Sequence, residues 1–100
     1  MKSIYVALLG FAALQSPVFA DQALAQKSNC LACHQVANKV VGPSFKDIAK
    51  KYAGKDVSAT LVSKVKGGGS GAWGAIPMPA NPQLSDDDAK KLVSWILSLK

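Results

Sequence analysis

The chain has 100 residues, which is enough for one small domain. Hydrophobic residues make up 49% of it, and this excludes a disordered or collagen-like protein. The charged residues are Lys and Asp, without Arg or Glu, and give a formal net charge of +6. A domain of this size buries little apolar surface, and the one disulfide that two Cys could form would close only a short loop. We therefore expect that the core is completed by a component other than the protein's own side chains.

Residues 1–20 predict a cleaved secretory signal peptide. Lys2 precedes an unbroken apolar run over residues 4–14, and small residues at Val18 and Ala20 suit cleavage after Ala20. The alternative is an uncleaved membrane anchor, but a spanning helix needs about 20 apolar residues. Either interpretation implies export, and the first leaves residues 21–100 as the mature domain.

Three short helices are predicted before residue 67, each after a residue that can cap its N-terminus. Gly54 is expected to end the second of them. The expected caps and helices are Asp21 for a helix that runs through residue 31, Ser44 for residues 45–52 and Asp56 for residues 57–66. No segment alternates between apolar and polar residues for long enough to predict a strand.

The last helix has the clearest pattern. Ser85 and Asp88 form a capping box, and the run of Asp residues there complements the positive end of the helix dipole. Apolar residues then recur at helical spacing and predict a buried stripe made of Ala89, Leu92, Val93, Ile96 and Leu97.

Residues 67–84 are rich in Gly and Pro, and by composition alone they predict a flexible linker. However, the segment contains Trp73, Ile76 and Met78, and Met78 is the only Met outside the predicted signal peptide. Long structureless segments are uncommon in small domains and are often functional. The linker interpretation leaves these three residues unexplained.

The sequence Cys30-Leu31-Ala32-Cys33-His34 is the attachment signature for c-type haem. One helical turn places both thiols on the same side, where they can add to the two vinyl groups of a porphyrin. The next residue, His34, then directs its imidazole at the iron, and it is the only His in the chain. We predict one haem c, linked by two thioethers, as the group that completes the core.

Three other interpretations of this motif are weaker. A thioredoxin-like redox pair calls for a βαβ context, which the sequence lacks. A zinc site needs four ligands, and Cys30, Cys33 and His34 supply three. A plain structural disulfide would leave His34 without a role.

Met78 is the candidate for a second axial ligand of the iron. A lone Met is most often a core filler. Met78, however, lies between Pro77 and Pro79, whose fixed φ angles stiffen the backbone, and it follows glycines that permit close approach to a flat ring. A Lys could ligate only if deprotonated, and its strongly hydrated ammonium makes it a poor choice at neutral pH.

With these residues, the chain from Asp21 on resembles the small bacterial class I cytochromes c of the short c-551/c-552 (c8) type, and the c-552 type most closely. The resemblance is carried by the haem motif and, in order, by Val41-Gly42-Pro43, Trp73-Gly74, Ile76-Pro77-Met78-Pro79 and the terminal helix with Trp95. It implies an all-α fold in which about four short helices wrap around one covalently bound haem.

The resemblance also implies roles for three residues around the ligands. The Pro43 carbonyl is expected to accept a hydrogen bond from the His34 imidazole, which would fix the ring. Trp73 is expected to donate to a haem propionate, and Asn81 to the Met78 sulfur. Ordinary roles in turns or in the core are the alternatives for all three.

A haem with both axial positions filled by side chains has no open position for oxygen, peroxide or a substrate. We therefore predict a periplasmic, non-enzymatic one-electron carrier with His34 and Met78 as iron ligands; Met/His ligation raises the reduction potential. One alternative is a five-coordinate haem protein that binds gases or acts as a peroxidase. A weaker one is a thiol–disulfide oxidoreductase.

The partners are predicted only in outline. Scattered Lys residues are commonly just a solvated surface, but a basic rim around the haem edge would steer an acidic redox protein. The resemblance suggests a bc-type or multihaem cytochrome as electron donor, and a terminal oxidase, nitrite reductase or peroxidase as acceptor. Neither nucleic acid nor stable membrane insertion after processing is expected, and the protein is expected to be a monomer.

Overall fold

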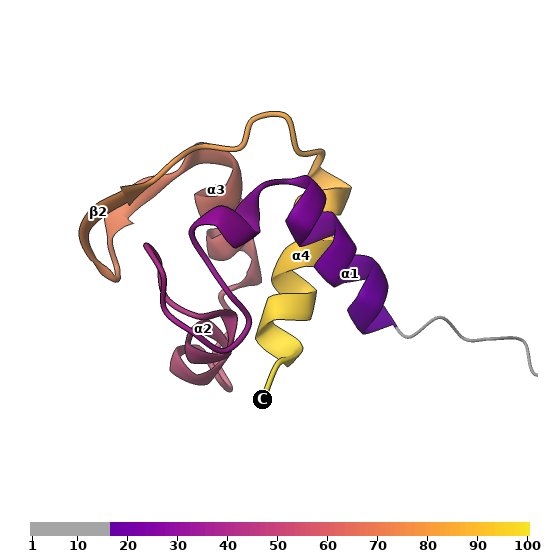
Figure 1. Cartoon of the computed structure of the whole chain (residues 1–100), viewed down its shortest axis with the longest axis horizontal. Helices are drawn as coiled ribbons and strands as arrows, with labels where there is room; N and C mark the ends of the chain where they lie inside the picture. Colours follow the sequence, from indigo (N-terminus) through magenta and orange to yellow (C-terminus); the bar gives the residue numbers. More distant parts are fainter. Residues whose placement is uncertain (1–16) are drawn as a thin grey trace, which may run out of the picture.

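The structure is a computed structural model that describes residues 17–100, with side chains from residue 21 on. Most of the predicted signal peptide therefore lies outside the described residues. The elements follow one another as α1 (Pro17–Lys27), the short 3-10 helix η1 (Cys30–Ala32), α2 (Phe45–Lys51), α3 (Ser58–Gly67), β1 (Gly69–Gly71), β2 (Gly74–Met78) and α4 (Asp86–Ser98) (Figure 1). The described chain is thus mostly helical, with four α-helices as predicted and one small two-stranded sheet.

Helix α4 lies at the centre of the fold and contacts α1, α2 and α3 (Figure 1). The predicted stripe is confirmed for Ala89, Leu92, Val93 and Ile96, which are buried, whereas Leu97 is only partly buried. Trp95, three residues after Leu92, is also buried. A wide apolar face of this kind lets one helix pack against three neighbours.

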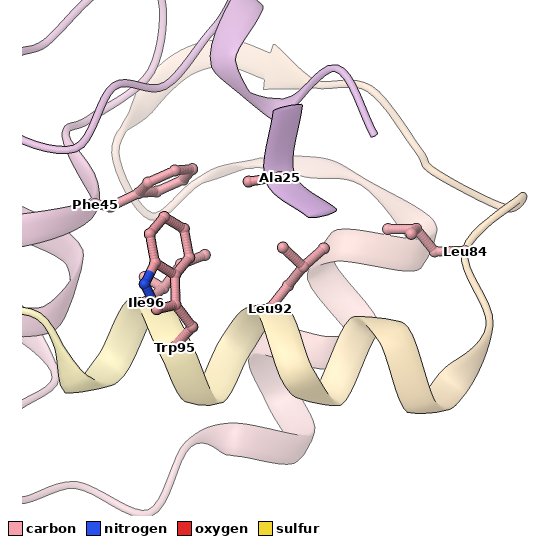
Figure 2. Packing of buried hydrophobic residues seen from close by; sticks show 6 residues of the cluster. All are labelled: Ala25, Phe45, Leu84, Leu92, Trp95 and Ile96. Carbon is pink, nitrogen blue, oxygen red and sulfur yellow. The ribbon is translucent and has the colours of Figure 1, made fainter. Parts of the chain in front are cut away.

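The core extends from α4 toward the haem motif. Trp95, Leu92 and Ile96 project from α4, and the Phe45 ring meets Trp95 edge to face, with ring centroids 5.4 Å apart at 72° (Figure 2). On its other side, Phe45 stacks on the imidazole of His34, with 5.3 Å between the ring centroids. The only His of the chain is therefore part of the packed core and not an isolated surface group.

Two predicted N-caps are confirmed and two are wrong. The Oγ atoms of Ser44 and Ser85 accept hydrogen bonds from the third residue of their helices, both at 3.1 Å. Asp21 lies inside α1, which already begins at Pro17. Asp56 lies one residue too early to cap α3, because Val57 holds the N-cap position and no side chain caps it.

The first helix is also shorter at its C-terminal end than predicted. Helix α1 ends at Lys27, and Asn29 takes the left-handed conformation at φ 62° before η1 begins at Cys30. A non-glycine residue in this region breaks a helix, and Asn tolerates it better than most. The break turns the chain, so that the two cysteines lie on a separate short turn.

The segment that the sequence left without strands forms a hairpin. Strands β1 and β2 pair antiparallel, Gly69 with Met78 and Gly71 with Gly74, with an irregularity between the two pairs. All its residues except Met78 are exposed, so neither face packs on the core and no apolar alternation marks it in the sequence. Among the described residues, no helix is long and apolar enough to cross a membrane.

We expect the Ser85→Ala variant to lower the free energy of unfolding by about 1 kcal/mol, because the amide of Asp88 loses its capping acceptor. Denaturant titration of the haem-loaded protein measures this. The matched control is Ser94→Ala, on an exposed position of the same helix, which should be neutral or slightly stabilising. Equal losses for the two variants would show that the cap does not hold α4.

Candidate functional site

A cavity of about 530 Å³ lies between the haem-motif turn on one side and the hairpin on the other. Its size falls in the range of pockets that enclose organic cofactors. Apolar side chains of α3 and α4 close its back wall: Leu61, Val65, Leu92, Val93 and Ile96. The four residues predicted as the site all line it: Cys30, Cys33, His34 and Met78.

Neither cysteine forms a disulfide, and both lie on one turn of the chain. The turn is closed by backbone hydrogen bonds to the Cys30 carbonyl, from the amide of Cys33 at 3.2 Å and from that of His34 at 2.9 Å. Burial raises the pKa of the Cys30 thiol above its ordinary value. Reactive redox thiols have a lowered pKa, so the environment of Cys30 does not favour thiol–disulfide exchange.

His34 is held in one orientation. The residue is 9% exposed, and its Nδ1 lies 2.7 Å from the carbonyl oxygen of Pro43, as the resemblance implied. A carbonyl only accepts, so Nδ1 carries a hydrogen and donates it, and in a neutral imidazole the lone pair is then on Nε2. Histidines that bind metals are commonly fixed in this way through the other ring nitrogen.

Gly42 leaves room for the His34 ring. A Cβ atom at Gly42 would lie 2.5 Å from Cε1 and 2.8 Å from Nδ1 of His34. The Gly42 amide also donates to the Cys33 carbonyl at 2.7 Å, which draws the loop back over the haem motif. In the sequence, Gly42 stands out only as part of Val41-Gly42-Pro43, and nothing local indicates that this position must lack a side chain.

Met78 lies on the other wall of the cavity, as the last residue of β2. It is partly buried, whereas the rest of β2 is exposed. Met78 pairs with Gly69, which lies just after the end of α3, so this pairing connects Met78 to α3. The structure therefore places a thioether and an imidazole on the two sides of one cavity, although 43 intervening residues separate them in sequence.

The hydrogen bond expected from Asn81 to the Met78 sulfur is not the one that the structure shows. Asn81 Nδ2 donates to the carbonyls of Val65 at 3.1 Å and Pro79 at 3.3 Å. The side chain therefore binds the end of α3 in this structure. The role of Asn81 toward the Met78 sulfur stays a prediction.

Trp73 lies at the turn between β1 and β2 and lines the cavity. Its side chain is 44% exposed, and Lys51 Nζ stands 4.3 Å from the centroid of its ring. The same ammonium donates to the Ala72 carbonyl at 2.8 Å, and so links α2 to the hairpin turn. The role of Trp73 toward a propionate stays a prediction.

These residues fit a haem. Two cysteines one turn apart, an imidazole hydrogen-bonded through Nδ1 and a thioether line a largely apolar cavity. Large apolar side chains at its rim are exposed, up to 68% for Ile76, and a flat apolar ring would cover part of them. Fold and site together define a small helical protein of the c-type cytochrome class.

Comparison with known proteins agrees with this class. The family model for cytochrome c matches residues 21–100, and the chain belongs to the cytochrome c family. It is 65% identical to cytochrome c-552 of Nitrosomonas europaea over 82 aligned residues. The aligned region covers 81% of this chain and 80% of that protein. It is 48% identical to cytochrome c-552 of Hydrogenobacter thermophilus, over 99% of this chain and 98% of that one.

Solved structures show the same fold. The crystal structure of wild-type Nitrosomonas europaea cytochrome c552 superposes with a TM-score of 0.76 at 61% identity, over 79% of this chain and 99% of that chain. The class I cytochrome MtoD of Sideroxydans lithotrophicus superposes with a TM-score of 0.71 at 37% identity, over 82% and 95%. The fold is thus that of the class I cytochromes c, and the cofactor is one covalently bound haem c, consistent with the single pair Cys30 and Cys33.

We expect the Gly42→Ala variant to be destabilised by about 1–3 kcal/mol, because the new methyl group has to displace the His34 ring. The free energy of unfolding of the haem-loaded protein measures this. Gly67→Ala is the control, since nothing lies within 4 Å of a Cβ atom there and the residue is helical. A Gly42→Ala variant as stable as the control would contradict the packing described here.

Proposed function

We propose that this protein is an exported electron carrier whose single haem has His34 and Met78 as axial ligands. The observation that carries the proposal is the cavity itself, which brings both thiols, the imidazole and the only Met of residues 21–100 together. Its relatives support the coarser conclusion of a small c-type cytochrome that carries electrons.

The haem supplies one chemical ability, the gain and loss of a single electron at its iron. Cys30 and Cys33 hold it covalently. The Pro43 carbonyl and the Phe45 ring fix the His34 imidazole, whose Nε2 would bind the iron. Met78 offers a soft thioether, which favours the ferrous state and raises the potential.

The alternative of a five-coordinate haem protein needs an open side opposite His34. In this structure, the wall that carries Met78 is joined to α3 through the pairing with Gly69 and through the hydrogen bonds of Asn81. Because this wall is anchored, Met78 is well placed to fill the coordination position of the iron opposite His34. We therefore favour electron transfer over gas binding or a peroxidase reaction.

Export and processing are part of the proposal. Residues 1–20 have the features of a signal peptide with cleavage after Ala20, and the match to the family starts at residue 21. In an oxidising compartment, two neighbouring thiols would otherwise form a disulfide. In this proposal both thiols form thioether bonds to haem and therefore cannot form a disulfide. The location we propose is the periplasm.

The rim of the cavity is suited to brief contact with redox proteins. Exposed apolar side chains of Val41, Trp73 and Ile76 line the cavity, as do Lys39 and Lys64. Lysines around a small apolar patch favour fast, weak association with an acidic surface. We propose redox proteins as partners, such as a bc-type or multihaem cytochrome as donor and a terminal oxidase, nitrite reductase or peroxidase as acceptor, with the carrier acting as a monomer.

The Met78→Ala variant tests the ligand assignment. The ferric wild-type protein should show the weak long-wavelength charge-transfer band of sulfur bound to iron. The variant should lose this band, have a lower reduction potential and bind carbon monoxide when ferrous. Met78→His should stay six-coordinate, also at a lower potential. Ile76→Ala, in the same strand, keeps the thioether and should keep the band.

Rapid binding of carbon monoxide to the ferrous wild-type protein would show an open iron. That result would replace the electron carrier with the gas-binding or peroxidase-like alternative.

Processing and attachment are tested by the intact mass of the protein purified from an expressing bacterium. The mass should equal that of residues 21–100 plus one haem. The haem should resist extraction by acidified acetone, and the denatured protein should have no titratable thiol. Extractable haem together with two free thiols would refute covalent attachment, whereas a different mass with bound haem would move only the cleavage site.

A further inference from the structure

The C-terminal end of α3 and the segment around Met78 form one hydrogen-bonded unit. The amide of Asn81 donates to the carbonyls of Val65 and Lys66 at 3.2 and 3.1 Å, and its side-chain Nδ2 donates to Val65 at 3.1 Å. The last carbonyls of a helix have no partner within the helix. Asn81 supplies partners here, and in doing so it holds the chain just after Met78 against α3.

Gly68 lies between these two parts. It is the C-cap of α3, with φ 70°, and its amide donates to the Lys64 carbonyl at 2.8 Å. A Cβ atom at Gly68 would lie 2.5 Å from the carbonyl oxygen of Met78, 2.8 Å from the amide nitrogen of Ala80 and 3.0 Å from the carbonyl carbon of Pro79. All three are backbone atoms, so no rotation of a side chain could relieve the contact.

We propose that Gly68 is a positioning residue for Met78. Because Gly68 has no side chain, the backbone of Met78 to Ala80 lies directly against the end of α3, and this contact sets how far the thioether reaches into the cavity. The inference rests on the proposed function, in which Met78 is an iron ligand.

The prolines on either side of Met78 explain why the backbone contact with Gly68 affects the position of the Met78 side chain. Pro77 and Pro79 fix φ on both sides of Met78, so the backbone cannot absorb a local shift by turning about these bonds. Rotation about these two bonds therefore cannot keep the Met78 side chain in place when its carbonyl is displaced. The rest of β2 is exposed, so burial does not hold it in place either.

The chain offers controls that separate the two effects of a methyl group at Gly68. Gly54 also has a positive φ, of 73°, but nothing lies within 4 Å of a Cβ atom there. Gly54→Ala therefore places a side chain at a similar positive φ without the contact. Gly67→Ala has neither strain nor contact and lies one residue away.

The experiment compares Gly68→Ala, Gly54→Ala and Gly67→Ala as haem-loaded proteins. The readouts are the sulfur-to-iron band of the ferric form and the rate at which the ferrous form binds carbon monoxide. Both are measured where denaturant titration shows each variant to be folded. We expect Gly68→Ala to lose much of the band and to bind carbon monoxide about tenfold faster than Gly54→Ala does. Gly54→Ala should be destabilised with its band unchanged, and Gly67→Ala should match the wild type.

A full band and slow binding of carbon monoxide in Gly68→Ala would overturn the positioning role while leaving Met78 as the ligand. A missing band in the wild-type protein would instead overturn the proposed function. The two failures are therefore distinct.

A measurement on the wild-type protein remains decisive if Gly68→Ala does not fold. As denaturant is added, the band and the hydrogen-exchange protection of the Asn81 amide should be lost together, because Met78 and the end of α3 move as one unit. Loss of the band at a denaturant concentration that leaves the Asn81 amide protected would overturn the proposal.

Discussion

The space in the middle of the fold is the constraint on which the rest of the structure depends. Helix α3 has no buried residue, although Leu61 and Val65 on its inner face are apolar, because this face borders the cavity. Among the residues that the structure describes, the buried core cluster joins Leu92, Trp95 and Ile96 of α4 to Phe45, Ala25 and Leu84 (Figure 2). A haem in the cavity would complete the apolar contacts of α3, so binding the cofactor and stabilising the fold are one event.

The two walls of the cavity are held in different ways. On one wall, His34 is buried, hydrogen-bonded to Pro43 and stacked on Phe45, which in turn packs on Trp95 of α4. On the other wall, Met78 belongs to an exposed hairpin that is fastened to the end of α3. Elements with few buried contacts open first in native proteins. The thioether side is therefore the more easily opened one, and its position depends on a few backbone contacts.

Features with a local chemical cause were predictable from the sequence, and those set by distant contacts were not. The caps at Ser44 and Ser85, the stripe of α4 and the haem motif each depend on residues within one or two helical turns. The same reasoning failed at Asp56. Helix α3 begins one residue later than predicted, so Val57 and not Asp56 takes the N-cap position. The hairpin was missed because its residues other than Met78 are exposed and so show no apolar alternation. The hydrogen bonds of Asn81, and the need for glycine at Gly42 and Gly68, arise from backbone segments brought together only by folding.

The exposure of the hairpin also has a physical explanation if the protein is an electron carrier. A partner has to come close to the cofactor, yet a deeply packed wall on both sides would keep it distant. Here Ile76, two residues before Met78, is the most exposed of the large apolar side chains, so the strand that offers the ligand also forms part of the surface. Such a strand cannot be held by burial. Its position has to come from directional backbone bonds, from stiff prolines and from the link that Lys51 makes to the hairpin turn. The hydrogen bonds at the end of α3 therefore fix the position of Met78 in place of a packed core.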